Sequence, residues 1–349
     1  MKNTIRIGDR LIGEGQPAYI IAEMSANHGH DFDQALRIIE AAHKAGADAV
    51  KLQTYTPDTM TIDCDNEWFR IHGTIWEGKN LHSLYGEAFT PWEWQPKLKE
   101  YAESLGMDCF SSPFDFTSVD FLEEMGVVAY KVASFEIVDI PLLEKIASTG
   151  KPVIVSTGMA SLSEIDEAVR TLRANGATDI ALLKCTSAYP ASPEEANLRT
   201  IPHLAKSFGL PAGLSDHTMG NGVAIAGVAL GACIVEKHFT IDRSQGGPDS
   251  AFSMEPDEFA SMVADIRMAE KALGEVSYEI TRKQKDSKVF RRSLFVVEDI
   301  KAGEELTERN VRSIRPGYGL HTRYLKVVLG KKAVVDIPRG TPLGWDKIG

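Results

Sequence analysis

The chain has 349 residues, of which 43% are hydrophobic and 25% charged, and its 38 Lys and Arg against 49 Asp and Glu give a formal net charge of −11. This balance is typical of a globular protein and excludes a disordered chain. The acidic excess argues against a general nucleic-acid binder, because such proteins bind phosphates through cationic side chains.

The length predicts two domains, although a single α/β barrel can reach roughly 250 residues. The longest apolar stretch without a charge, residues 222–235, is too short to span a bilayer, and residues 1–10 carry charges where a signal peptide would be apolar. Cys109, Cys185 and Cys233 lie in or beside apolar runs, and no CxxC spacing occurs. We therefore expect a soluble cytoplasmic protein with buried, reduced thiols.

Eight short apolar runs alternate with stretches of helical period between residues 19 and 238. The runs begin at Tyr19, Ala49, Asp108, Tyr130, Val153, Ile180, Ala212 and Ile234. Near-continuous apolar strands that alternate with helices predict a parallel sheet covered by helices. Eight such units fit an α/β fold of the (β/α)8 TIM-barrel type better than an open doubly wound sheet.

The connection between the second and third runs is much longer than the others and contains Trp68, Trp76, Trp92 and Trp94. A connection that follows a barrel strand lies at the C-terminal face, where substrate-binding loops grow. A merely exposed insertion would not need four tryptophans. We interpret this segment as a substrate-binding insertion.

The pattern changes at Ser277. Residues 277–290 are charged and poorly periodic, and residues 291–349 contain short β-like runs separated by turns rich in Gly and Pro. Residues 291–349 hold 12 Lys and Arg against 7 Asp and Glu, a net charge of +5, which leaves −16 for residues 1–290. We predict a barrel over residues 1–276, a linker over 277–290 and a small, basic β-rich domain over 291–349.

Polar side chains close every predicted strand, and the active sites of such barrels lie at these strand ends. His217 and His238 close the seventh and eighth strands, so their imidazoles could bind one divalent ion. The alternative is a pair of histidines that only form hydrogen bonds within a polar rim.

Four lysines lie on or near predicted strands: Lys51, Lys131, Lys184 and Lys237. With the Ser and Thr donors, we expect them around one mouth of the barrel, which indicates a phosphate or carboxylate ligand. A lysine in this position is either a Schiff-base nucleophile or a fixed cation for an anionic substrate. The residue types alone leave both Schiff-base aldolase chemistry and metal-assisted carbanion chemistry open.

Eight ordered motifs resemble the sialic acid synthase family. They are IAEMSANHGHDFDQA, GADAVKLQTY, FSSPFD, YKVASFEI, VSTGMAS, LLKCTSAYP, GLSDHT and EKHFT. The segment RRSLFVVEDIKAGEELTERNVRSIRPGYGL is similar to the antifreeze-like (SAF) domain that follows the barrel in that family. The resemblance covers nearly the whole chain. It implies condensation of phosphoenolpyruvate with an open-chain sugar, release of phosphate, and a divalent metal, with Mn²⁺ expected first and Mg²⁺ or Co²⁺ as alternatives.

The resemblance also implies roles for individual residues. His217 and His238 would hold the metal, Glu23 would stabilise charge on phosphoenolpyruvate or orient water, and Glu136 would bind sugar hydroxyls or move a proton. The family positions that bind phosphoenolpyruvate match Lys51, Ser112, Lys131, Ser134, Ser156 and Ser215. The sugar is expected at Gln53, Ser187, Tyr189 and Arg315. In this mechanism the lysines are cations.

Within the family, the segments GTIWEGKNLHSLY, TPWEW and DSAFSM are most similar to bacterial members whose sugar is a diacetamido-trideoxy hexose, 2,4-diacetamido-2,4,6-trideoxy-L-altrose. Ser187 stands where members that use N-acetylmannosamine have Asn, which argues against that sugar. Synthesis of N-acetylneuraminic or legionaminic acid stays an alternative. A Schiff-base lyase and a non-enzymatic ice- or carbohydrate-binding module are more distant ones.

Arg315 matches the arginine that the SAF domain delivers to the active site of the neighbouring protomer in this family. The resemblance therefore implies a domain-swapped homodimer, with neither nucleic acid nor membrane as a partner.

Overall fold

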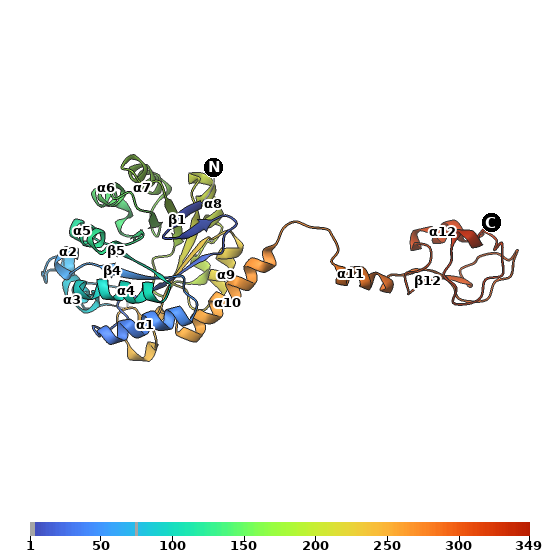
Figure 1. The fold of residues 1–349 in the computed structure, drawn as a ribbon, viewed down its shortest axis with the longest axis horizontal. Coiled ribbons are helices and arrows are strands. Elements are labelled where there is room, and N and C mark those ends of the chain that lie inside the picture. The colour runs from blue at the N-terminus through green and yellow to red at the C-terminus, as the bar shows by residue number, and fades with distance from the viewer. Residues whose placement is uncertain (1–3, 74–75) are drawn as a thin grey trace. The chain divides into compact units, whose positions relative to one another are not determined.

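The computed structural model describes residues 4–73 and 76–349. The chain divides into two compact units, Met1–Gly274 and Glu275–Gly349 (Figure 1). The sequence prediction ends the barrel domain at residue 276 and starts the small domain at residue 291.

The first unit contains a closed barrel of eight parallel strands in the order β10-β3-β4-β5-β6-β7-β8-β9, which confirms the predicted (β/α)8 architecture. The strands are β3 (Tyr19–Glu23), β4 (Ala49–Thr54), β5 (Asp108–Pro113), β6 (Tyr130–Val132), β7 (Val153–Ser156), β8 (Ile180–Cys185), β9 (Ala212–Asp216) and β10 (Ile234–His238). Each begins at the residue where its apolar run begins.

Helices follow the strands and surround the barrel (Figure 1). They are α1 (Phe32–Lys44), α4 (Gln95–Ser104), α5 (Phe116–Met125), α6 (Ile140–Ser148), α7 (Leu162–Ala174), α8 (Thr200–Phe208), α9 (Gly222–Ala229) and α10 (Pro256–Leu273). Helix α7 illustrates their origin: Ser161 and Glu164 form a capping box at its start, and its buried residues recur at helical spacing. The long connection between β4 and α4 contains α2 (Pro57–Met60) and α3 (Leu81–Ala88).

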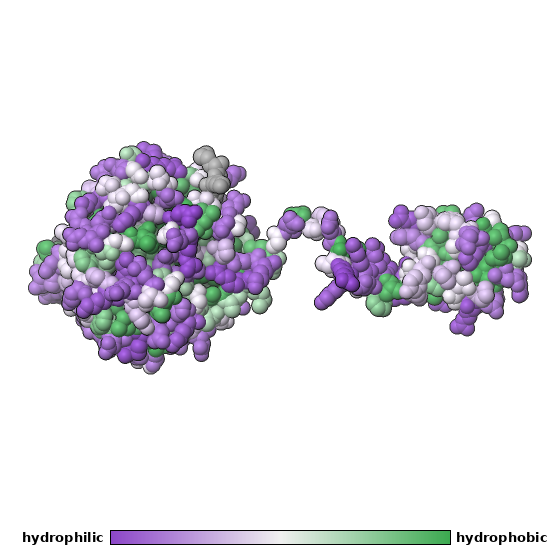
Figure 2. Space-filling view, viewed as in Figure 1, coloured by the Kyte–Doolittle hydropathy of each residue, from purple (hydrophilic) through white to green (hydrophobic). Residues whose placement is uncertain are grey.

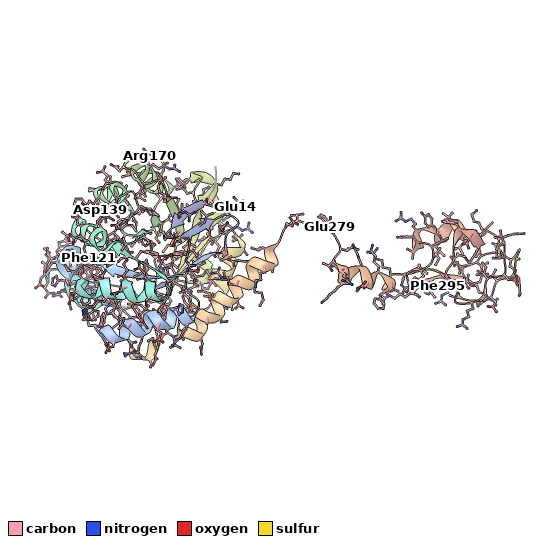
Figure 3. All side chains as sticks on the ribbon, in the orientation of Figure 1. Glu14, Phe121, Asp139, Arg170, Glu279 and Phe295 are labelled. Atoms are coloured by element: carbon pink, nitrogen blue, oxygen red, sulfur yellow. The ribbon has the colours of Figure 1, made fainter. Side chains whose placement is uncertain are left out.

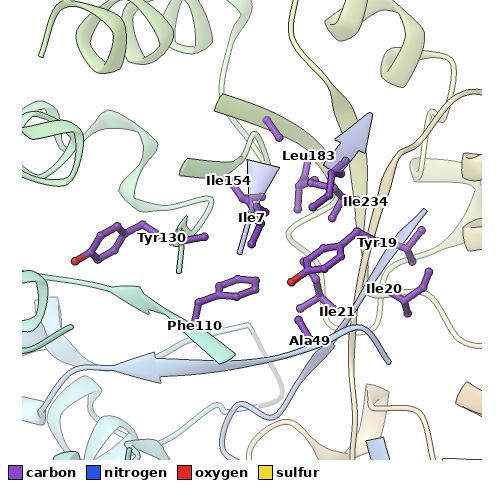
Figure 4. Close-up of a cluster of buried hydrophobic side chains, with 14 of the residues drawn as sticks. Ile7, Tyr19, Ile20, Ile21, Ala49, Phe110, Tyr130, Ile154, Leu183 and Ile234 are labelled. Atoms are coloured by element: carbon purple, nitrogen blue, oxygen red, sulfur yellow. The ribbon is translucent and has the colours of Figure 1, made fainter. Parts of the chain in front are cut away.

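A two-stranded antiparallel hairpin, which the sequence analysis did not predict, precedes the barrel. Strands β1 (Thr4–Ile7) and β2 (Arg10–Gly13) pair across a turn at Gly8, whose φ of +51° suits glycine. Ile7 is fully buried and lies with Phe110, Ile154 and Ile234 in the apolar cluster inside the barrel (Figure 4). The hairpin therefore contributes to this apolar cluster, which we call the apolar base of the barrel. The polar residues lie at the other end of the strands.

The second unit has its own core. Strands β11 (Ser293–Val296) and β12 (Val311–Ile314) pair antiparallel, and α12 (Leu325–Val328) contributes Val328 to a cluster with Leu294 and Ile337. The predicted linker contains a short helix, α11 (Arg282–Asp286). Side chains pack within the second unit around β11, whereas Glu279 belongs to an exposed stretch (Figure 3).

Among residues 4–73 and 76–349, none of the helices combines the length and the apolar character that crossing a bilayer requires. The four cysteines are all unbridged, and Cys109, Cys185 and Cys233 are buried, which confirms the expected thiols.

Candidate active site

The inner surface of the barrel changes from apolar to charged along the strands. On β10, alternate residues face the same side, so Ile234, Glu236 and His238 follow one another along the interior. Ile234 lies in the apolar cluster at the base (Figure 4), and Glu236 contacts Lys51 and Lys131. The C-terminal end of the barrel is therefore its polar end.

Two lysines and two glutamates form a buried ionic cluster at this end, which we call the charged layer (Lys51, Lys131, Glu23 and Glu236). Lys51 Nζ lies 2.6 Å from Glu23 Oε2 and 3.7 Å from Glu236 Oε1. Lys131 Nζ lies 3.3 Å from Glu236 Oε1. No side chain in this layer is more than 5% exposed. Such burial is tolerable only because each charge has a partner.

The charges also control protonation. Burial alone would lower the pKa of Lys51, but Glu23 and Glu236 raise it above its ordinary value. Burial lowers the pKa of Lys131. Burial would raise the pKa of Glu236, but the Lys131 and Lys51 ammonium groups hold it below its ordinary value. Lys51 is therefore an ammonium cation and Glu236 a carboxylate.

Hydroxyl groups surround the charged layer. Lys51 donates a hydrogen bond to Ser112 Oγ at 3.2 Å, and Ser215 donates one to Glu236 Oε1 at 3.1 Å. Ser156 Oγ is buried and has no hydrogen-bond partner among the described residues. Buried ammonium groups with hydroxyl groups beside them are suited to a phosphate or carboxylate ligand.

Gly158, after β7, brings two further predicted serines to one place. A Cβ on Gly158 would lie 2.5 Å from Ser134 Oγ and 2.6 Å from Ser187 Oγ, closer than real Cβ atoms approach. The φ of Gly158 is +29°. Only glycine leaves room for both serines against this backbone.

His217 and His238 lie side by side, with ring centroids 5.3 Å apart. His217 Nδ1 lies 2.9 Å from Thr186 O, and because a carbonyl oxygen only accepts, Nδ1 carries a proton. Burial would lower the pKa of His217, but its contact with Cys185 raises it above the ordinary value. His238 Nδ1 is buried without a hydrogen-bond partner in the described part of the chain. Burial holds the pKa of His238 well below its ordinary 6.5, so its ring is neutral.

An imidazole nitrogen with a free lone pair is a ligand for a divalent transition metal. In the described ranges, no group of three or more His, Cys, Asp and Glu could hold such an ion. These two histidines could therefore hold a metal only if substrate or water supplied its other ligands.

The residues expected to bind the sugar divide between the two units. Gln53 donates hydrogen bonds to Glu23 Oε1 and Ser25 Oγ, both at 3.1 Å. The Tyr189 ring lies 4.5 Å from the His217 ring. Arg315 is an exposed residue that follows β12 in the second unit, so the barrel unit itself does not contain it.

Glu136 begins a short 3₁₀ helix, Glu136–Val138, after β6. Its Oε2 is buried without a hydrogen-bond partner among the described residues. Burial raises the pKa of Glu136 from 4.5 to about 7, and burial likewise raises the pKa of Glu23 to about 7 against the opposing effect of Lys51. A carboxyl group with a pKa near 7 is suited to proton transfer at neutral pH.

Two of the four strand lysines do not join the charged layer. Lys184 Nζ donates to Cys185 O at 2.6 Å, and Lys237 Nζ donates to Asp216 Oδ2 at 2.7 Å. Both lie one residue from an inward-facing position, Cys185 or Glu236, so they face the other side of their strands. Grouping all four lysines at one mouth was wrong.

The sequence analysis did not assign roles to three residues that the structure places here. Glu236 is the centre of the charged layer, Cys185 Sγ lies 3.9 Å from His217 Nδ1, and Asp249 accepts a hydrogen bond from Ser25 Oγ. The two-residue spacing of Glu236 and His238 on one strand is a signal that could have identified Glu236. No comparable spacing marks Asp249, which lies in a loop.

Comparisons with known proteins agree with this geometry. Residues 38–278 match the model of the NeuB family, and residues 291–349 match the SAF domain. The chain is 46% identical to the pseudaminic acid synthase of Helicobacter pylori over 95% of this chain and 98% of that protein. It is 38% identical to the N,N'-diacetyllegionaminic acid synthase of Campylobacter jejuni over 90% of this chain and 95% of that protein.

A solved structure is also similar. The N-acetylneuraminic acid (sialic acid) synthetase of Leptospira borgpetersenii, in complex with citrate, has 35% identity and a TM-score of 0.73, covering 82% of this chain and 95% of that one.

The raised pKa of Glu136 predicts a pH-dependent effect of Glu136→Gln on stability. The folded protein keeps this proton up to about pH 7, whereas the unfolded chain releases it near 4.5, so wild-type stability falls as pH rises between these values. Denaturant unfolding should therefore show Glu136→Gln gaining about 2 kcal/mol relative to wild type between pH 5 and pH 8. Glu144→Gln, at an exposed position on α6, should show no such gain. A gain of equal size in both variants would contradict the assignment.

Proposed function

The chain belongs to the NeuB family, and on that premise we propose that it acts as a pseudaminic acid synthase. It condenses phosphoenolpyruvate with 2,4-diacetamido-2,4,6-trideoxy-L-altrose to give pseudaminic acid and phosphate. The observation that carries the proposal is the charged layer with its hydroxyl groups, at the same end of the barrel as His217 and His238. The higher identity to the pseudaminic than to the legionaminic acid synthase, 46% against 38%, supports the choice of sugar.

Phosphoenolpyruvate binds at the charged layer. Lys51 and Lys131 neutralise its phosphate and carboxylate, and Ser112, Ser156 and Ser215 donate hydrogen bonds. The pairing of Lys51 with Glu23 favours this role over a Schiff base, because a nucleophilic lysine must lose its proton.

The reaction then proceeds in three steps. Carbon 3 of phosphoenolpyruvate attacks the aldehyde carbon, a C–C bond forms, and the aldehyde oxygen takes a proton. Water adds to carbon 2, where positive character has developed, and releases a proton that balances the first. The tetrahedral carbon then breaks its C–O bond to phosphate, its hydroxyl gives up a proton to the departing phosphate, and carbon 2 becomes a ketone.

Two carboxyl groups serve these steps. Glu23 lies in the charged layer, where its carboxylate stabilises positive character at carbon 2 or orients the water. Glu136, with its pKa of about 7, binds a sugar hydroxyl or transfers the proton at the aldehyde oxygen.

A divalent metal on His217 and His238, most simply Mn²⁺, would polarise the sugar aldehyde as a Lewis acid. Mg²⁺ and Co²⁺ are the alternatives. The protein's contribution is to present two adjacent imidazole rings, one of them oriented by the hydrogen bond to Thr186 O. Tyr189 lies against His217 and Gln53 lies against Glu23, and both would contact the sugar.

We also infer a domain-swapped homodimer in which Arg315 of one protomer completes the sugar site of its partner. The barrel unit lacks this residue, and the second unit exposes Arg315. The second unit also exposes apolar side chains, including Val327, Val334 and Val335, as the hydrophobic areas in Figure 2 illustrate. The charge of +5 on residues 291–349, against −16 on residues 1–290, favours docking on an acidic barrel. The four unbridged cysteines support a reducing, cytoplasmic location.

The function is tested by phosphate release from phosphoenolpyruvate with three sugars offered separately: the altrose compound, N-acetylmannosamine and the legionaminic acid precursor. Turnover with the altrose compound should exceed the others by at least about tenfold in kcat/KM. Good turnover of another sugar without turnover of the altrose compound would replace the proposed substrate.

The same assay tests the metal. EDTA should abolish turnover and Mn²⁺ should restore it, and His217→Gln and His238→Gln should each abolish Mn²⁺ binding in calorimetry while the circular dichroism spectrum is retained. Activity that survives EDTA and is trapped by borohydride would instead identify a Schiff-base enzyme.

The swapped dimer predicts complementation between two inactive variants, Arg315→Ala and Glu23→Gln. In a mixed dimer, one of the two sites has both an intact Glu23 and the partner's intact arginine. Co-expression of the two variants should therefore restore up to about a quarter of wild-type activity. Absence of recovery in a verified mixed dimer, or an active monomer in sedimentation, would contradict the swap.

A further inference from the structure

The four tryptophans of the long β4–α4 connection have different environments, so the insertion does not act as one substrate-binding surface. Trp92 Nε1 donates to Tyr55 O at 3.0 Å, and the Trp94 ring lies 5.6 Å from the Phe32 ring, contacts that attach α4 to the barrel. Trp68 is 87% exposed. Of these four, Trp76 is the one that contacts Tyr189, which lies against His217, and Pro248 in the loop after β10.

Trp76 connects two loops above the polar end of the barrel. Its Nε1 donates a hydrogen bond to Pro248 O at 3.0 Å, which joins the insertion to the loop after β10. Its ring lies 5.9 Å from the Tyr189 ring. The hydrogen bond to Pro248 O and the contact with Tyr189 both restrict the position of the indole. Its orientation is therefore set before a ligand binds.

The aromatic contacts continue from Trp76 to the histidines. The Tyr189 ring lies 4.5 Å from His217 and 5.1 Å from Phe252, and the Phe252 ring lies 4.9 Å from His238. Tyr189 therefore stands between Trp76 and the histidine pair. If the aldehyde of a sugar lies at the histidines and its carbon chain follows Tyr189, the far end of the chain lies at Trp76.

We propose that Trp76 is a specificity-determining residue whose indole binds the apolar methyl end of the sugar substrate. The inference rests on the proposed function and extends it. A 6-deoxy sugar ends in a methyl group where an ordinary hexose ends in a hydroxymethyl group. An aromatic face favours the methyl group, because a hydroxyl there would lose hydration without gaining a hydrogen-bond partner.

The test compares two sugars that differ only at carbon 6, 2,4-diacetamido-2,4,6-trideoxy-L-altrose and its 6-hydroxy analogue. A single apolar contact of this kind changes kcat/KM by roughly 10- to 200-fold. Wild type should prefer the 6-deoxy sugar by about tenfold or more, and Trp76→Ala should lose most of that preference while the KM for phosphoenolpyruvate changes less than about twofold.

Two further variants complete the design. Trp68→Ala removes an exposed tryptophan from the same insertion and should leave the preference unchanged. Trp76→Phe keeps an aromatic face but cannot donate to Pro248 O, so it should keep the preference while the KM for the sugar rises. This variant also provides the test if Trp76→Ala does not fold, since loss of the preference with an aromatic ring retained would contradict the proposal.

The outcomes separate the two proposals. If wild type turns over neither sugar, the proposed function fails. If wild type turns over the 6-deoxy sugar and Trp76→Ala lowers kcat/KM equally for both sugars, or for neither, the function stands and Trp76 does not determine specificity.

Discussion

The structure depends on the burial of two lysines inside the barrel. Ammonium groups as inaccessible as those of Lys51 and Lys131 need compensating charge, and Glu23 and Glu236 supply it. Removing one partner would leave an uncompensated buried charge, so the four residues form one unit. If the barrel bound no ligand, apolar side chains in place of these four residues would make it at least as stable. We therefore attribute the charged layer to the binding of an anionic substrate.

The rest of the barrel makes this layer possible. The apolar base, to which the hairpin contributes Ile7, lies beneath it, and the alternation of β10 carries the interior from Ile234 through Glu236 to His238. The layer is therefore next to the buried His217 and His238, in a site with little access to water. Anion binding and aldehyde activation can then take place on adjacent strands.

Much of the fold could be predicted from sequence because apolar runs and helical periods are local signals. All eight strand starts coincide with the apolar runs. The hairpin was missed because its two strands have four residues each, too few to show a period. Lys184 and Lys237 were grouped with Lys51 because fully apolar strands do not reveal which residues face inward. Trp76 lies against Tyr189 because two loops that are distant in the sequence meet, and a local sequence pattern does not predict such a contact.

The net charge of −11 likewise conceals an uneven distribution along the chain, with −16 on residues 1–290 and +5 on residues 291–349. The central claim, however, concerns the charged layer, and calorimetric binding of phosphoenolpyruvate tests it most directly. Lys131→Met should weaken binding by at least about tenfold, because it removes a buried charge-assisted contact. Lys184→Met, on the other side of its strand, should leave binding within about twofold of wild type. Unchanged binding in a folded Lys131→Met variant, or equal weakening in both, would contradict the account.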